Sequence, residues 1–100
     1  MTNSVLCLGG LDLLGLSGLL VDARACQENG AACGLAATAV VREDSRRVAA
    51  ILPRSPREVA TDLAYLHRRL KPRALKIGML ANEKTVAACC RFLDRHPMRH

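Results

Sequence analysis

Aromatic residues are almost absent from this sequence. Tyr65 and Phe92 are the only two among 100 residues, and there is no tryptophan. Proteins that bind single-stranded nucleic acid stack the bases on aromatic rings in a basic groove. The arginines here are dispersed along the chain, so the sequence argues against nucleic-acid binding in spite of a formal net charge of +6. Half of the residues are hydrophobic, which predicts an aliphatic core.

Long apolar runs are also missing. The most apolar region, residues 5–20, is interrupted by Asp12 and several glycines, and it falls short of the roughly 18 consecutive apolar residues that a membrane span needs. No basic side chain precedes this region, as one would in a signal peptide. We therefore expect no membrane span and no secretion, and predict a cytoplasmic location.

The cysteines lack a pattern. There are five, an odd number, and none of them form a C-x-x-C pair: Cys7, Cys26, Cys33, Cys89 and Cys90. This spacing fits zinc ligation and a disulfide framework poorly. The sequence predicts thiols buried in a reducing compartment and no metal site.

Short apolar segments, most of them bounded by glycine or proline, predict strands. They are residues 5–8, 32–41, 47–52 and 74–80, with 47–52 as an edge strand and 74–80 as a buried one. Lys76 is unusual in such a buried strand. We expect either that its ammonium group emerges at the strand end or that its stem extends along the apolar surface to reach solvent.

Three helices are predicted between and after these strands. The first covers residues 18–29, with Ser17 as its cap and Gly30 as its stop. The second begins with a capping box, Ser55 to Glu58, and runs to about residue 71 with an apolar stripe. His67 lies on the arginine-rich side of that helix, where we expect it to be solvated. Asn82 caps a third helix that ends near residue 95, with Val86, Cys90 and Leu93 on its apolar face.

The predicted order is β-α-β-(β)-α-β-α. Continuous apolar strands that alternate with amphipathic helices indicate an α/β domain over residues 1–100, with a mostly parallel sheet covered by helices. The sequence stops after a helix, where an alternating fold would supply another strand, so we expect a truncated domain or one that a partner completes.

Ligands of open parallel sheets bind at the carboxyl ends of the strands. Three such ends are predicted, at residues 9–18, 41–44 and 78–80. The first is glycine-bearing, but it matches neither the P-loop nor the dinucleotide fingerprint. On pattern alone, these glycines fit a tight turn, Asp22 fits a carboxylate that complements a helix dipole, and Glu43 with Asp44 fits an acidic turn.

Three blocks in order resemble the hydroxymethylpyrimidine and phosphomethylpyrimidine kinase family. Residues 9–24 resemble the family's Ala-Gly-x-Asp-Pro-Ser-Gly-Gly-Ala-Gly-x-x-Ala-Asp-x-Lys. Residues 38–45 resemble its Thr-Ala-x-Val-x-Gln-Asn/Asp-Ser/Thr, and residues 76–80 are its Lys-Ile-Gly-Met-Leu unchanged. The resemblance covers nearly the whole chain and implies the N-terminal half of a ribokinase-like three-layer α/β/α fold.

The resemblance also implies a pocket for a small pyrimidine alcohol. Gly10 would let the backbone approach the substrate, and Asp22 would hydrogen-bond its hydroxymethyl or ring groups. Val41 and Met79 would pack against the ring. Position 43, a glutamine in the family and Glu43 here, would face the ring nitrogen and the exocyclic amine.

Two departures from the family change this expectation. Pro-Ser-Gly-Gly has become residues 13–16, Leu-Leu-Gly-Leu, and bulky leucines are expected to reshape or collapse the pocket loop. Glu43 offers only acceptors where a glutamine offers a donor and an acceptor. We therefore predict weakened or altered binding.

The family uses ATP and Mg²⁺, held mainly by the C-terminal half. No catalytic residue, nucleotide pocket or metal site is identified in this sequence, although Asp12 and Asp44 are candidate metal contacts. The leading hypothesis is a kinase of thiamine biosynthesis that is inactive as this chain alone. The alternatives are a non-catalytic pyrimidine- or vitamer-binding or regulatory module, an interaction subunit whose open sheet edge pairs with another chain, and pyridoxal kinase-like specificity. The expected partner is a second copy of the chain or the missing C-terminal half.

Overall fold

The computed structural model describes residues 3–100. Its elements follow in the order β1 (Ser4–Asp12), α1 (Leu19–Glu28), β2 (Ala32–Glu43), β3 (Val48–Pro53), α2 (Pro56–Leu70), β4 (Ala74–Ile77) and α3 (Glu83–Arg95). The predicted order of strands and helices is confirmed.

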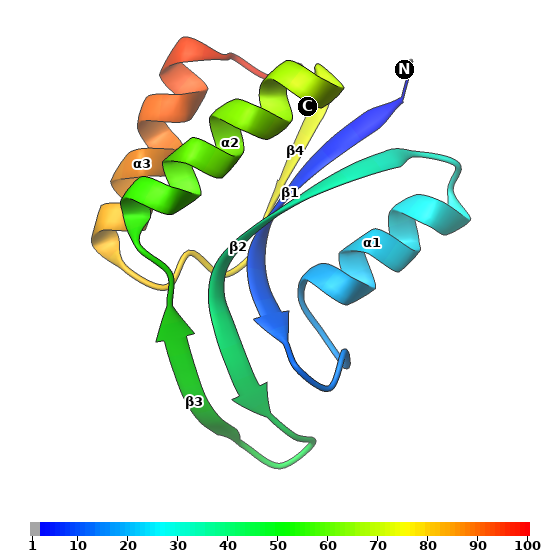
Figure 1. Cartoon of the computed structure of the whole chain (residues 1–100). Coiled ribbons are helices and arrows are strands. Elements are labelled where there is room, and N and C mark those ends of the chain that lie inside the picture. The colour runs from blue at the N-terminus through cyan, green and yellow to red at the C-terminus, as the bar shows by residue number, and fades with distance from the viewer. Residues whose placement is uncertain (1–2) are drawn as a thin grey trace.

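The four strands form one sheet in the order β3-β2-β1-β4. β1 runs parallel to β2 and to β4, whereas β3 pairs antiparallel with β2 at one edge. Helix α1 covers one face of the sheet, and α2 and α3 lie on the other face (Figure 1). The predicted α/β fold with a mostly parallel sheet is therefore confirmed.

Strand β1 is longer than predicted. It continues through Gly9 and Gly10 to Asp12, with a register irregularity between the two glycines. The sequence pattern predicts that the strand ends at these glycines, but they pair with β2 at Ala37 and Ala39. Backbone pairing to a neighbouring strand decides the boundary here, and a local glycine signal does not reveal it.

Strand β4 is shorter and more exposed than predicted. It ends at Ile77 and lies at the edge of the sheet, so the prediction of a buried strand over residues 74–80 is wrong. Lys76 and Ile77 are exposed. The backbone N–H of Gly78 still donates to the carbonyl of Leu8, which holds the following segment against β1.

The main core lies between the sheet and the α2–α3 layer. Leu6 and Leu8 of β1 pack there with Val59 and Leu63 of α2 and with Phe92 of α3. All but Phe92 are fully buried, and burying one such aliphatic side chain contributes roughly 1.5–3 kcal/mol. The core is aliphatic apart from Phe92, as the composition predicts.

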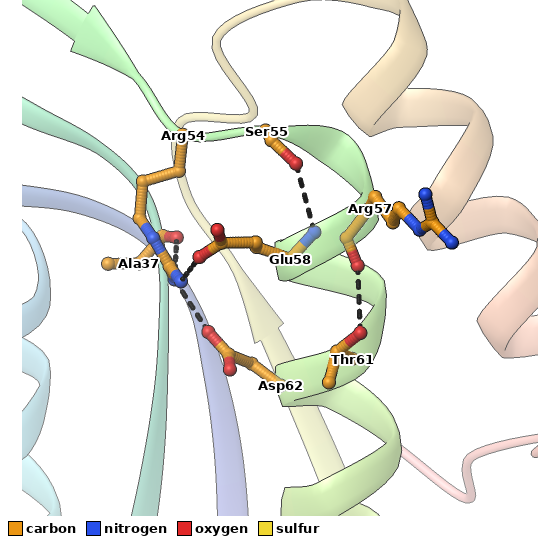
Figure 2. Close-up of polar contacts among 7 residues, drawn as sticks. All are labelled: Ala37, Arg54, Ser55, Arg57, Glu58, Thr61 and Asp62. Carbon is orange, nitrogen blue, oxygen red and sulfur yellow. Dashed lines mark hydrogen bonds and ion pairs between the residues drawn. The ribbon is translucent and has the colours of Figure 1, made fainter.

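The start of α2 is held by a cap and an arginine. The Ser55 side chain accepts a hydrogen bond from the N–H of Glu58, as predicted. The Glu58 carboxylate does not close the capping box. It accepts instead from Arg54, whose guanidinium also binds Asp62 and the carbonyl oxygen of Ala37 on β2 (Figure 2). Arg54 thus connects the first turns of α2 to the sheet.

Helix α1 begins without the predicted cap. Gly18 occupies the N-cap position, no side chain bonds there, and Ser17 lies outside the helix. The prediction that Gly30 stops the helix is confirmed, since Gly30 follows the C-cap residue with a φ of +71°.

Helix α3 begins as predicted, with the Asn82 side chain accepting from the N–H of Thr85. Its predicted apolar face is only partly correct, because Leu93 packs against the core but Val86 and Cys90 are exposed. The buried side chains are Thr85, Ala88, Cys89 and Phe92. Small residues pack closely against α2, a contact that hydrophobicity alone does not single out.

His67 is half-buried, and so less solvated than predicted. Its ring lies 5.8 Å from Phe92 and 3.9 Å from His96, measured between centroids. These two rings cover it from the neighbouring helix and its C-cap.

None of the helices within residues 3–100 combines the length and apolarity needed to cross a membrane.

Candidate functional site

A cavity of about 300 Å³ opens where β1, β2 and the segment after β4 end. All five residues that the family resemblance singles out line it: Gly10, Asp22, Val41, Glu43 and Met79. They come from β1, α1, β2 and the segment after β4. The fold brings them together at the carboxyl ends of the parallel strands, where ligands of such sheets bind.

At Gly10 the backbone itself lines the cavity. A Cβ atom at this position would lie 3.2 Å from a Val41 methyl group and 3.6 Å from the Met79 sulfur. The missing side chain leaves room between these two apolar groups. A flat ring that enters the cavity can therefore contact backbone there.

The loop from β1 to α1 is organised by Asp12. This carboxylate is 1% exposed, and its two oxygens accept hydrogen bonds from the N–H groups of Leu14 and Leu16. Gly15 takes the positive φ in the loop, so the leucines adopt ordinary backbone conformations.

The leucines do not collapse the cavity, contrary to expectation. Leu13, Leu14 and Leu16 are 56%, 63% and 63% exposed and do not line it. Leu13 and Leu14 instead line a separate hollow of about 310 Å³ beside β2. The departure from the family pattern changes the outer surface of the loop and leaves the cavity open.

Asp22 forms an ion pair with Lys76. The Lys76 ammonium lies 2.9 Å from Oδ1 and 3.0 Å from Oδ2 of Asp22, and the Asp22 side chain is 14% exposed. Lys76 projects from the edge strand over the α1 face of the sheet, and its side chain is half-exposed at the cavity rim. The carboxylate lies in the first turn of α1, where a negative charge also complements the helix dipole.

Glu43 and Met79 are held by Ser17 and Thr38, whose roles at this site the sequence did not predict. The Ser17 hydroxyl donates to Oε1 of Glu43 at 2.6 Å. The buried Thr38 hydroxyl donates to the carbonyl oxygen of Met79, also at 2.6 Å, and so fixes a segment that belongs to no strand.

Four contributors to the site were missed or misread from sequence: Ser17, Gly18, Thr38 and Lys76. Gly18, Thr38 and Lys76 match the family blocks, so the resemblance offered a signal for these three. Nothing local marks Ser17, because its partner is 26 residues away.

The cavity is acidic. Asp12, Asp22 and Glu43 line it. Of the described residues that line the cavity, Lys76 alone is cationic, and its ammonium is already paired with Asp22. Carboxylates accept hydrogen bonds from amino and hydroxyl groups and repel polyphosphates. This arrangement suits a small ring that carries such donors, and it does not fit the triphosphate of ATP.

The two candidate metal contacts hold the backbone of their loops. Both Asp12 oxygens accept from backbone amides, and Asp44 Oδ1 accepts from the N–H groups of Arg46 and Arg47. Among residues 3–100, carboxylates form no group of three that could share an ion. Asp12 and Asp44 thus organise loops, and their carboxylates are already engaged by backbone amides.

Comparison with known proteins identifies the relatives of this chain. The family described as phosphomethylpyrimidine kinase matches residues 12–100. The chain belongs to this family.

Solved kinases share its fold. A phosphomethylpyrimidine kinase from Clostridium difficile 630 superimposes with a TM-score of 0.92 at 19% identity, over 99% of this chain and 43% of that one. A Staphylococcus aureus pyridoxal kinase, in complex with AMP-PCP and pyridoxal, gives 0.86 at 22% identity over 100% and 37%. An ADP complex of Bacillus subtilis pyridoxal kinase gives 0.89 at 20% over 99% and 38%. The chain therefore spans about two fifths of the length of these kinases.

Proposed function

We propose that this chain supplies the substrate-binding part of a hydroxymethylpyrimidine kinase-type protein of thiamine biosynthesis. The ligand is 4-amino-5-hydroxymethyl-2-methylpyrimidine. The observation that carries the proposal is that the five residues of the family's pocket line one cavity of suitable size and hydrogen-bonding character. We place the protein in the cytoplasm, where free cysteines stay reduced.

Each lining residue has a proposed role. Asp22 accepts a hydrogen bond from the hydroxymethyl group, and Glu43 accepts from the ring amine. Val41 and Met79 contact the two faces of the ring, and the bare backbone at Gly10 lets the ring approach. The three carboxylates disfavour the phosphate ester of the same alcohol, so the unphosphorylated alcohol is the preferred ligand.

Isothermal titration calorimetry with the pyrimidine alcohol tests this proposal. We expect saturable binding that Asp22→Asn weakens roughly tenfold or more, because a hydrogen bond to a charged group contributes about 1.5–3 kcal/mol. The matched control is Asp94→Asn, an exposed aspartate on α3 that lies outside the cavity. Absence of binding to the folded wild-type chain, or equal affinity in Asp22→Asn, would contradict it.

The substitution of glutamine by Glu43 leads to a prediction about pH. A carboxylate cannot donate to a ring nitrogen, whereas a protonated ring can donate to the carboxylate. We expect the affinity of the wild type to rise as pH falls towards the range in which the ring is protonated. Glu43→Gln should bind more tightly at neutral pH and lose much of this dependence. Calorimetry on both proteins across pH checks this, and equal affinities at every pH would refute it.

We further propose that the chain alone does not transfer a phosphoryl group. Such transfer depends on positioning and on cations that stabilise the transferring group. The acidic cavity and the engaged carboxylates of Asp12 and Asp44 support this proposal. In a coupled assay with ATP, Mg²⁺ and the pyrimidine alcohol we expect no turnover, and turnover would overturn the proposal.

Pyridoxal is the second candidate ligand, because two of the similar folds are pyridoxal kinases. Pyridoxal is also a ring with a hydroxymethyl group. Titration under the same conditions separates the two ligands. Tighter binding of pyridoxal would identify it as the ligand in place of the pyrimidine alcohol. Binding of either ligand without turnover would favour a non-catalytic binding module.

A further inference from the structure

Three cysteines meet beneath α1, although their spacing in the sequence forms no motif. Cys7 comes from β1, Cys26 from α1 and Cys33 from the start of β2. Their three sulfur atoms all lie within 4.8 Å of one another, and those of Cys7 and Cys33 are 3.8 Å apart. All three are free thiols.

The strand register explains why these side chains meet. Cys33 pairs with Val5, two residues before Cys7, so both cysteines point to the same face of the sheet. That face is covered by α1, from which Cys26 points down onto the strands. Cys7 is 1% exposed, whereas Cys26 and Cys33 are less completely buried.

The sulfur separations match a single ion bound by three thiolates. Metal–thiolate bonds are about 2.3 Å long, which places three sulfurs about 4.0 Å apart around an ion in their plane. Closing the cluster from its present separations needs side-chain adjustments of less than about an ångström by the same geometry. The three thiols therefore need no rearrangement of the strands to share an ion.

The ligand set also indicates which ion. Thiolates are soft ligands that select Cu⁺ and Zn²⁺. Zinc is almost always four-coordinate in structural sites. Among residues 3–100, no fourth cysteine, histidine or carboxylate joins this group, so a zinc ion here would need water as its fourth ligand. Three-coordination by thiolates is the ordinary preference of Cu⁺ and not of Zn²⁺.

We propose that Cys7, Cys26 and Cys33 form a binding site for one Cu⁺ ion that fastens α1 to the sheet. Binding displaces the thiol protons into solvent and forms three copper–sulfur bonds without any change in oxidation state. The site is independent of the proposed pyrimidine function, although α1 also carries Asp22 to the cavity.

Burial is consistent with protonated thiols in the metal-free site. Desolvation first, and the neighbouring Cys33 second, raise the pKa of the Cys7 thiol well above its usual range. Desolvation likewise raises the pKa of Cys33. Copper must therefore compete with protons, and its affinity should increase with pH.

The experiment titrates the reduced full-length chain with Cu⁺ under anaerobic conditions against a chromophoric Cu⁺ chelator. We expect one ion per chain, and an X-ray absorption spectrum with three sulfur neighbours. Cys26→Ser and Cys33→Ser should each weaken binding at least tenfold. Both positions are half-buried, so these variants should keep the wild-type circular dichroism spectrum.

The matched control is Cys90→Ser, an exposed cysteine on α3 that should bind copper as the wild type does. Wild-type affinity in both Cys26→Ser and Cys33→Ser would overturn the site. Loss of binding in Cys90→Ser, or a Zn²⁺ affinity above that for Cu⁺, would overturn it as well.

Discussion

Gly18 is the residue on which the entry into α1 depends. It has a φ of +71°, and a Cβ there would collide with the carbonyl oxygen of Gly10. Leu11 and Gly18 also form an isolated β-bridge that closes the loop. The close approach of the α1 N-terminus to β1 therefore requires a residue without a side chain at position 18.

We predict that Gly18→Ala is more destabilising than Gly30→Ala. Gly30 has the same φ of +71°, but a Cβ there would meet nothing within 4 Å. Gly30→Ala should lower the free energy of unfolding by roughly 1–2 kcal/mol, the cost of placing a residue with a Cβ in the left-handed region. Gly18→Ala should add about 1–3 kcal/mol for the steric clash. Urea unfolding of both variants measures the difference, and equal losses would show that the loop adjusts freely.

At the scale of elements, the two serines that precede helices behave differently. Ser55 caps α2, whereas Ser17 binds Glu43 and caps nothing. We predict that Ser55→Ala lowers the free energy of unfolding by about 1 kcal/mol. Ser17→Ala should change it by less than about 0.5 kcal/mol. Thermal or urea unfolding of the pair checks this. A larger loss in Ser17→Ala would mean that its bond to Glu43 stabilises the fold.

The contact between α2 and α3 should make stability depend on pH. Burial, and secondarily the charge of His96, lower the pKa of His67. The folded state then binds fewer protons than the unfolded state, in which histidine titrates near about 6.5. Stability from this group is complete above that pH and falls as the pH drops below it.

We expect urea unfolding to show a larger loss between about pH 7.5 and about pH 5.5 in the wild type than in His67→Gln, since histidine titrates in this range. His100→Gln, at the exposed terminus, is the control and should keep the wild-type dependence. An unchanged pH dependence in His67→Gln would contradict the assignment.

The elements show which features can be predicted from sequence. The order of the elements, and whether each is a helix or a strand, were predictable because glycine, proline and apolar periodicity are local signals. The extent of β1, the buried face of α3 and the environment of His67 depend on neighbours that are distant in sequence. The cavity was predictable through the family blocks. The cysteine cluster was not, because its members come from three elements without regular spacing.

Considered as a whole, the molecule is a sheet with two outer strands, β3 and β4. β3 ends in Pro53 and follows Arg46 and Arg47, features that discourage pairing with another chain. β4 pairs only with β1 in the part of the chain that the structure describes, apart from one bond from the Leu75 N–H to the His100 carbonyl. Both edges expose apolar side chains, Ile77 on β4 and Ile51 on β3, but β4 contains no proline, so it is the edge more open to pairing.

We predict that the chain associates through β4 as its concentration rises. Light scattering after size-exclusion chromatography should show the average mass increasing. Ile77→Lys should reduce this increase because a charge on an edge strand opposes pairing. Ile51→Lys, on β3, should leave it unchanged. A monomer at all concentrations would argue against an interaction subunit.

The ion pair between Lys76 and Asp22 has a consequence for any ligand of the cavity. The ammonium contacts both oxygens of the carboxylate to which we propose that the ligand binds, so the protein contains an internal competitor. Added salt screens an attraction between partly exposed charges, and it has little direct effect on an uncharged guest. Ionic strength should therefore favour occupancy by a neutral alcohol, the reverse of the usual trend for charged ligands, and each guest that binds should release a lysine into water.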